Sequence, residues 1–175
     1  EVDSGERPFE GLETVLRIED VHFDYNSGTQ VPALAGVSIE VPAHRMTALV
    51  GPSGGGKSTL VDMLPRLRGP DSGHILIDDT PIEEFKLASL RAGIAYVPQE
   101  AQVFNVSAAE HIGYGKVGAS LDEIREAARL AGADSFLSAL PQGYDTLLGE
   151  NGHRMSGGQR QRLDLARGLV GRTPI

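Results

Sequence analysis

One nine-residue stretch has the residue types and the spacing of a phosphate-binding loop. It consists of Gly51, Pro52, Ser53, Gly54, Gly55, Gly56, Lys57, Ser58 and Thr59, which fits the pattern G-x-x-x-x-G-K-[ST]. Glycines let the backbone bend and bring its N–H groups close to phosphate oxygens. Lys57 supplies a positive charge for the β- and γ-phosphates, and the Ser58 hydroxyl can ligate Mg²⁺. The stretch therefore predicts a site for a nucleotide and Mg²⁺.

The sequence around this loop predicts the elements that would hold it. Apolar residues 46–50 predict a buried strand before the loop, and the apolar residues after Lys57 predict a helix that ends at Pro65. The N-terminus of that helix adds a positive dipole end near the phosphates. The alternative is a glycine-rich turn that only caps a helix, and the strand–loop–helix order argues against it.

A second glycine motif, Ser156, Gly157, Gly158 and Gln159, opens the last predicted helix. Ser156 and Gln159 have the spacing of an ordinary helix cap. Two glycines in a first helical turn cost roughly 1 kcal/mol each relative to alanine. A cap does not require that cost, whereas close approach of the backbone to an anion does. We favour phosphate binding here and keep the helix cap as the alternative.

Tyr25 ends an alternating run and allows two interpretations from the residues alone. It is either an aromatic strand residue in a half-buried core or a flat face for a nucleotide base. The residues by themselves favour the core position, because aromatic residues are common in strands.

The chain divides into a polar linker, residues 1–11, and one domain, residues 12–175. Alternating apolar residues in 15–25 and 34–41 predict two strands of a small antiparallel sheet, joined through Asn26, Ser27 and Gly28. After the phosphate loop, predicted strands at 75–77 and 94–97 alternate with helices. This order indicates an α/β core with a mainly parallel sheet.

Residues about 100–155 are predicted to form a helical subdomain inserted into this core. The stretch from 107 to 140 is rich in alanine, glutamate and leucine, and residues 120–123 have the spacing of a capping box.

Composition limits the class of protein. The chain has 175 residues, of which 40% are hydrophobic and 23% charged, as in ordinary globular domains. A net charge of −8 argues against a general surface for nucleic acid or anionic lipid. Without cysteine there is no disulfide framework or thiolate metal site. No paired metal-ligand spacing is found among the histidines, which are His22, His44, His74, His111 and His153.

Taken in order, these motifs resemble the nucleotide-binding domain of ABC (ATP-binding cassette) transporters over about residues 16–175. Residues 96–100 resemble the Q-loop of that family, and residues 155–159 resemble its L-S-G-G-Q signature, with Met155 in place of Leu. The resemblance implies a P-loop NTPase (RecA-like) α/β core with an N-terminal antiparallel β subdomain and an inserted α-helical subdomain. The stretches after the Q-loop and before the signature resemble those of exporters, and His111 stands where the family usually has Asn.

The resemblance also implies roles for individual residues. Tyr25 would stack on adenine, which reverses the preference from the residues alone. Lys57 and Gln99 would be catalytic residues, and Ser58 and Gln99 would ligate Mg²⁺. Glu150 would contact coupling helices of a membrane domain, with a solvated loop carboxylate as the alternative. The signature residues would bind, in trans, the ATP of a second domain arranged head to tail, and these are Ser156, Gly157, Gly158 and Gln159.

The function implied is ATP binding and hydrolysis that power an exporter at the cytoplasmic face of a membrane. Its partners would be transmembrane domains, on the same or a separate chain, and a second nucleotide-binding domain in a homo- or heterodimer, with no nucleic acid. In the family, the acidic strand end that supplies the general base follows the position of Ile175. We therefore expect residues 1–175 alone to bind ATP weakly and to hydrolyse it poorly.

Two other functions fit parts of the sequence. One is a nucleotide-binding module without catalysis. The other is a soluble ABC-type ATPase of DNA repair or chromosome maintenance, a class with long coiled-coil insertions. Only about a hundred residues separate Ser58 from Ser156, and they show no sustained heptads.

Overall fold

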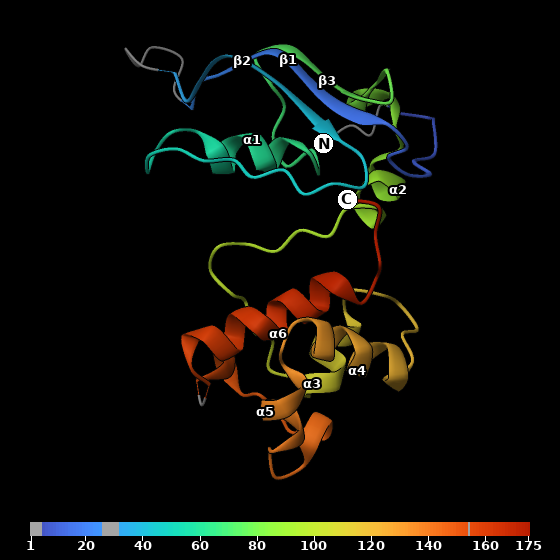
Figure 1. Cartoon of the computed structure of the whole chain (residues 1–175), viewed down its shortest axis with the longest axis vertical. Coiled ribbons are helices and arrows are strands. Elements are labelled where there is room, and N and C mark those ends of the chain that lie inside the picture. The colour runs from blue at the N-terminus through green and yellow to red at the C-terminus, as the bar shows by residue number, and fades with distance from the viewer. Residues whose placement is uncertain (1–4, 26–31, 154) are drawn as a thin grey trace. The chain divides into compact units, whose positions relative to one another are not determined.

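The structure is a computed structural model that describes residues 5–25, 32–153 and 155–175. The chain forms two compact units, Glu1–Ile94 with Pro174–Ile175 and Ala95–Thr173 (Figure 1). Each unit has its own cluster of buried apolar side chains. Among the described residues, no helix has both the length and the apolar character needed to cross a bilayer.

An antiparallel sheet is the frame of the first unit. Strand β1 (Val15–Phe23) pairs with β2 (Leu34–Pro42) on one side and with β3 (Ser72–Ile77) on the other, and β4 (Thr80–Pro81) completes the order β2-β1-β3-β4. The predicted antiparallel pairing of the first two strands is confirmed. Their predicted connection through residues 26–28 lies outside the described residues.

One helix packs its apolar side on this sheet. Helix α1 (Lys57–Met63) buries Leu60 and Met63 in the same cluster as Ile75 and Ile77 of β3, and it lies along one face of the sheet (Figure 1). The 3-10 helix η1 (Ile82–Glu84) and helix α2 (Leu87–Ala92) follow β4 and add Ile82 and Leu90 to the cluster, both of them almost fully buried. This packing fixes α1, and with it the end of the glycine loop.

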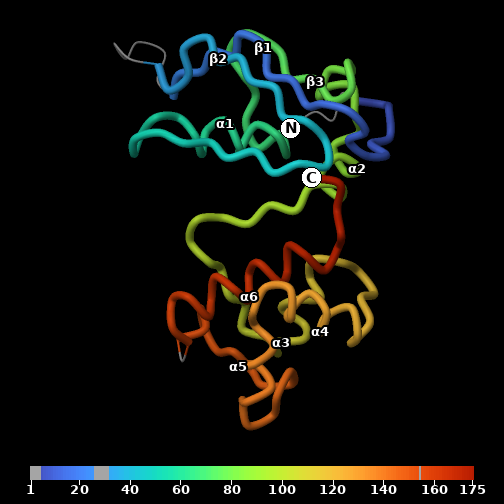
Figure 2. The backbone as a smooth tube through the Cα atoms, viewed as in Figure 1, coloured from blue at the N-terminus to red at the C-terminus, as the bar shows by residue number. Residues whose placement is uncertain are grey.

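Two predicted strands do not form. Residues 46–50 and 94–97 have no strand pairing. Figure 2 shows the path of the backbone between β2 and α1. Met46 is 97% exposed and Val50 is 92% exposed. A strand needs a neighbouring backbone for its hydrogen bonds, and no described segment pairs with either stretch. The predicted mainly parallel sheet is therefore absent from the described residues, and β3 runs antiparallel to β1 instead.

Residues 5–11, which are predicted to be a linker, make contacts within the first unit. The N–H of Arg7 donates to the carbonyl of Glu84 at 3.0 Å, and the carbonyl of Arg7 accepts from Lys86 at 2.8 Å. Phe9 is buried with its ring edge-on to Phe85. The boundary at residue 12 stays a prediction.

The second unit is helical. Its helices are α3 (Ala108–Gly113), α4 (Leu121–Leu130), α5 (Asp134–Ser138) and α6 (Gly157–Leu169), with 3-10 helices η2 (Gly143–Asp145) and η3 (Glu150–Gly152). Helices α3, α4 and α6 contact one another around a core that includes Ile112, Ala128 and Leu163. The predicted capping box at Ser120 forms, because Glu123 and Ser120 exchange hydrogen bonds. The limits of the helical subdomain at about 100 and 155 stay predictions.

We predict that Gly115→Ala destabilises the second unit strongly. A methyl group at Gly115 would lie 1.8 Å from the carbonyl oxygen of Arg167, and backbone of α6 cannot move aside cheaply. Gly113→Ala is the matched control, since its methyl group would meet only Ile124 at 3.6 Å. Chemical denaturation should show a loss of about 2 kcal/mol or more for the first variant, whereas the second should stay equal or gain up to about 1 kcal/mol. Equal stability of the two variants would contradict the close contact.

Candidate functional site

The glycine loop of the first unit has a shape that requires glycine. Gly54 and Gly56 have φ angles of 78° and 76°, in the left-handed region that other residues avoid. At Gly56 a methyl group would also lie 2.3 Å from the carbonyl oxygen of Ala33. Residues 51–55 are exposed, so their backbone faces solvent at the start of α1. Alanine or any larger residue at these two positions would change the path of the loop.

Lys57 lies over this loop. Its Nζ donates to the carbonyl oxygens of Gly51 at 3.0 Å and Pro52 at 2.6 Å. The N–H of Gly55 also donates to the Pro52 carbonyl, at 3.2 Å, which closes the loop on itself. The ammonium group is thus held at the exposed backbone that would face a phosphate. Ser58, the next residue, is exposed in the first turn of α1.

The first turn of α1 carries no competing negative charge. Gly56 at its N-cap makes no side-chain cap, and no acidic residue occurs in the turn. Its backbone N–H groups therefore meet no carboxylate from that turn or from the cap residue. This local charge arrangement suits an anion on a chain whose net charge is −8.

Tyr25 is joined to this helix. Its hydroxyl shares a hydrogen bond with Thr59 Oγ1 at 2.9 Å, and the guanidinium carbon of Arg68 lies 4.8 Å from the centre of its ring. Phe23 packs edge-on against the ring. The side chain is 52% exposed, so it is not a core residue of β1. The structure thus brings Tyr25 and the glycine loop together through α1.

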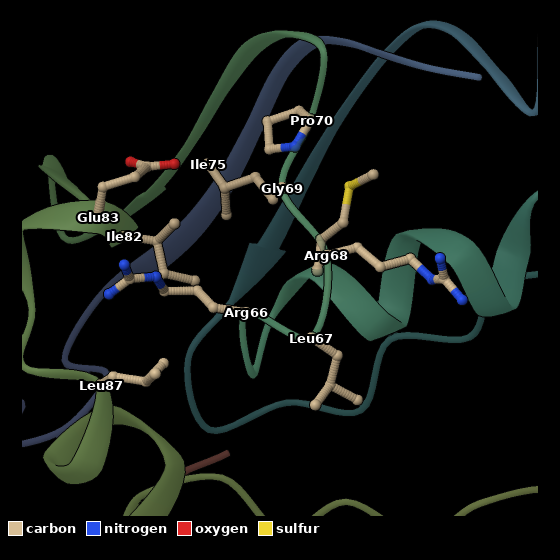
Figure 3. Close-up of a pocket in the computed structure, with 10 residues that line it drawn as sticks. Arg66, Leu67, Arg68, Gly69, Pro70, Ile75, Ile82, Glu83 and Leu87 are labelled. Atoms are coloured by element: carbon tan, nitrogen blue, oxygen red, sulfur yellow. The ribbon is translucent and has the colours of Figure 1, made fainter. Parts of the chain in front are cut away.

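The sequence analysis did not identify Arg68, whose guanidinium lies over the ring of Tyr25. The only signal was a pair of arginines, Arg66 and Arg68, after the predicted helix. Figure 3 shows their side chains directed to opposite sides of a cavity of about 270 Å³. Arg66 donates to the Phe85 carbonyl at 3.0 Å, and Arg68 forms an ion pair with Asp62 at 3.8 Å. Both cations are engaged and the cavity is lined mainly by apolar side chains, so it does not suit a phosphate group.

The second glycine motif lies in the second unit, where α6 begins. Ser156 Oγ accepts from the N–H of Gln159 at 3.2 Å, and Gln159 Oε1 accepts from the N–H of Ser156 at 2.9 Å. The helix cap that the sequence left as an alternative is therefore formed. It does not explain the glycines between these two residues.

Among the described residues of the second unit, no backbone conformation or contact requires glycine at 157 or 158. Neither residue has a positive φ angle, and a methyl group at either position would meet nothing within 4 Å. Both residues are exposed, and the first turn of α6 contains no acidic side chain. Their backbone N–H groups are among the first of the helix, which have no partner inside it. Because glycine has no side chain, the backbone N–H groups at these two positions are open to solvent.

Gln99 is exposed in an irregular stretch of the second unit. Glu150 is also exposed, in η3, directly after Gly149 with its φ angle of 73°. The predicted site residues are thus divided between the units. Tyr25 and residues 51–59 belong to the first unit, and Gln99 and residues 156–159 belong to the second.

A model of the family described as "ABC transporter" matches residues 34–175, which is most of the chain. The chain belongs to the ABC transporter family. This membership confirms the predicted fold class, a P-loop NTPase with an N-terminal antiparallel sheet and added helices.

Several of the similar proteins are transporters by name. The chain is 43% identical over 175 residues to an ATP-dependent lipid A-core flippase of Chromohalobacter salexigens, covering 100% of this chain and 30% of the relative. It is 45% identical over 170 residues to the ABC multidrug transporter mdr4 of Aspergillus fumigatus, covering 96% and 13%. A solved bacterial Atm1-family ABC exporter with ATP bound matches with a TM-score of 0.90 at 41% identity, covering 97% and 30%. The chain thus spans 30% or less of the length of these proteins.

We predict that Lys57→Ala weakens ATP binding by about tenfold or more, because a hydrogen bond to a charged group contributes roughly 1.5–3 kcal/mol. Isothermal titration calorimetry of the full-length protein with ATP would measure the dissociation constant. Lys86→Ala is the matched control, since it removes the same charge from an exposed position at α2. Equal affinities in the unsubstituted protein and Lys57→Ala would exclude the loop as the nucleotide site.

Proposed function

We propose that this chain is the ATP-binding and ATP-hydrolysing domain of an ABC exporter, and that it works in a head-to-tail dimer of such domains. The observation that carries the proposal is the pair of glycines at 157 and 158, which neither their own conformation nor packing against the described residues of their unit requires. Open glycines at a helix N-terminus suit an anion from another molecule. The glycine loop at Lys57 supplies the complementary half of such a site.

ATP would bind to the first unit through its phosphates and its base. The backbone of residues 51–56 and the Lys57 ammonium face the phosphates, with Ser58 and Thr59 at the start of the helix. Tyr25 offers a half-exposed ring to adenine, and its bond to Thr59 holds it near the loop. A donor set of backbone N–H groups and one ammonium fits a triphosphate.

Mg²⁺ would be held chiefly by phosphate oxygens and water, with the hydroxyl of Ser58 and the amide oxygen of Gln99 as protein ligands. Both side chains are exposed and uncharged, which fits an ion that keeps most of its ligands from substrate and solvent. When bound, the ion neutralises charge that develops on the phosphates. Gln99 also orients the attacking water in this proposal.

The partners of the domain would be a second nucleotide-binding domain, identical or different, and transmembrane domains on the same or a separate chain. Ser156, Gly157, Gly158 and Gln159 would complete the partner domain's ATP site. Glu150, exposed in η3, would contact the membrane part, and the domain would lie at the cytoplasmic face of a membrane. The names of the relatives, a flippase, a multidrug transporter and an exporter, support transport as the function.

We predict that Gly157→Asp in the intact polypeptide leaves ATP affinity within about twofold but lowers ATP turnover by at least about 100-fold. The added carboxylate would repel the partner's phosphates and cover the free N–H groups of α6. Turnover with saturating ATP and Mg²⁺, together with equilibrium ATP binding, would test this. Gly69→Asp is the control, because Gly69 is equally open and has no positive φ angle.

Gly157→Ala provides a second comparison. Its methyl group meets nothing in its own unit, so stability should stay equal or rise by up to about 1 kcal/mol. Normal turnover of Gly157→Asp would refute the role in trans. ATP binding without turnover in the unsubstituted intact protein would instead indicate a nucleotide-binding module without catalysis.

A further inference from the structure

Two polar side chains lie in the core of the second unit. His111 of α3 and Asp164 of α6 are both 0% exposed, among apolar residues such as Ile112 and Leu163. Nε2 of His111 lies 3.5 Å from Oδ1 of Asp164, and the guanidinium of Arg167 lies 2.8 Å from the same oxygen. Ionisable groups are rarely buried without partners, because they lose their hydration.

These side chains hold the backbone of one irregular segment. The N–H of Phe104 donates to Nδ1 of His111 at 3.3 Å, and the N–H of Gln102 donates to Oδ2 of Asp164 at 3.1 Å. The Arg167 guanidinium lies 5.0 Å from the centre of the Phe104 ring. The segment has no strand or helix of its own, so these side chains supply hydrogen bonds that secondary structure would otherwise make.

The contact with Phe104 requires a neutral imidazole. Burial, and then the charge of Arg167, lower the pKa of His111 to about 4, although Asp164 acts in the opposite direction. Near pH 7 the ring is therefore neutral. Because Nδ1 accepts from Phe104, the single ring proton is on Nε2, which faces Asp164. The distance of 3.5 Å between Nε2 and the Asp164 carboxylate is longer than that of a regular hydrogen bond.

The cluster contacts the parts of the chain that follow the two site motifs of this unit. The segment that it holds begins three residues after Gln99. Asp164 and Arg167 belong to α6, the helix whose first turn carries Gly157 and Gly158. The same three side chains therefore touch both the segment that leaves Gln99 and the helix that carries the second glycine motif.

We propose that His111, Asp164 and Arg167 are positioning residues that join the segment after Gln99 to α6, so that Gln99 and the second glycine motif keep a fixed geometry within the unit. The inference rests on the proposed ATPase function. Apolar residues could fill the same volume without the cost of desolvating charges. In this proposal, turnover depends on the hydrogen-bonding atoms at position 111 and not only on the volume of the ring.

Three variants of the intact polypeptide test this. His111→Leu fills space but has no polar atom, whereas His111→Asn keeps an acceptor for Phe104 and a donor for Asp164. His111→Phe places an aromatic ring without nitrogen atoms at this position and replaces the Leu variant if that variant does not fold. His74→Leu, at an exposed position of β3, controls for loss of a histidine. Each variant is measured for amide hydrogen exchange in residues 101–106, for ATP affinity and for ATP turnover.

The apolar variant should exchange the amide hydrogens of Gln102 and Phe104 about tenfold faster or more. Its turnover should fall by about 10- to 100-fold, because misplacement by about 1 Å is enough for such a loss, while its ATP affinity stays within about twofold. His111→Asn should restore both the slow exchange and most of the turnover. A purely space-filling role predicts no such rescue.

Unchanged exchange in the apolar variant would overturn the anchoring, and unchanged turnover would overturn the positioning role. Equal turnover defects in His111→Leu and His111→Asn would also overturn it. Absence of ATP hydrolysis by the unsubstituted protein is a separate result. It would remove the ATPase function, while the exchange measurement would still decide whether the segment is anchored.

Discussion

The candidate site depends on one constraint, which is that the backbone must come close to phosphate. A triphosphate is best surrounded by backbone N–H groups, and side chains at the point of contact would hold it away. At Gly54 and Gly56 the left-handed backbone conformation requires glycine. Glycine also leaves room for phosphate, so the shape of the loop and the access of the ligand favour the same residue. At Gly157 and Gly158 the described part of their own unit leaves open space, so neither conformation nor packing there accounts for the glycines. This difference between the two motifs is the basis of our proposal that the second one serves a ligand bound to another molecule.

The first unit connects this loop to a rigid support. Helix α1 is packed on the sheet by Leu60 and Met63, and it carries Thr59, which holds the hydroxyl of Tyr25. Movement of α1 would therefore displace the lysine, the loop and the aromatic ring together. The antiparallel sheet contributes no ligand of its own but determines where this group of residues lies.

In the second unit, buried polar side chains support an irregular segment, as the sheet supports the loop in the first. Helix packing accounts for its apolar core, yet the core also contains His111 and Asp164, which a stability argument alone would not favour. Their hydrogen bonds to Gln102 and Phe104 give an irregular segment defined partners. Such a segment could otherwise move independently of α6.

The sequence by itself determined the residue pattern of the glycine loop, the pairing of the first two strands, the family and the cap at Ser120, because each is a local pattern of residue types and spacings. It did not determine whether residues 46–50 and 94–97 form strands, since an apolar run records a tendency to be buried and pairing requires a neighbouring backbone. Only the tertiary structure showed that Tyr25 meets Thr59, that Gly157 and Gly158 face open space, and that His111 meets Asp164. The two contacts join residues far apart in the chain. Like the open space at the two glycines, they depend on how whole elements pack rather than on any local pattern.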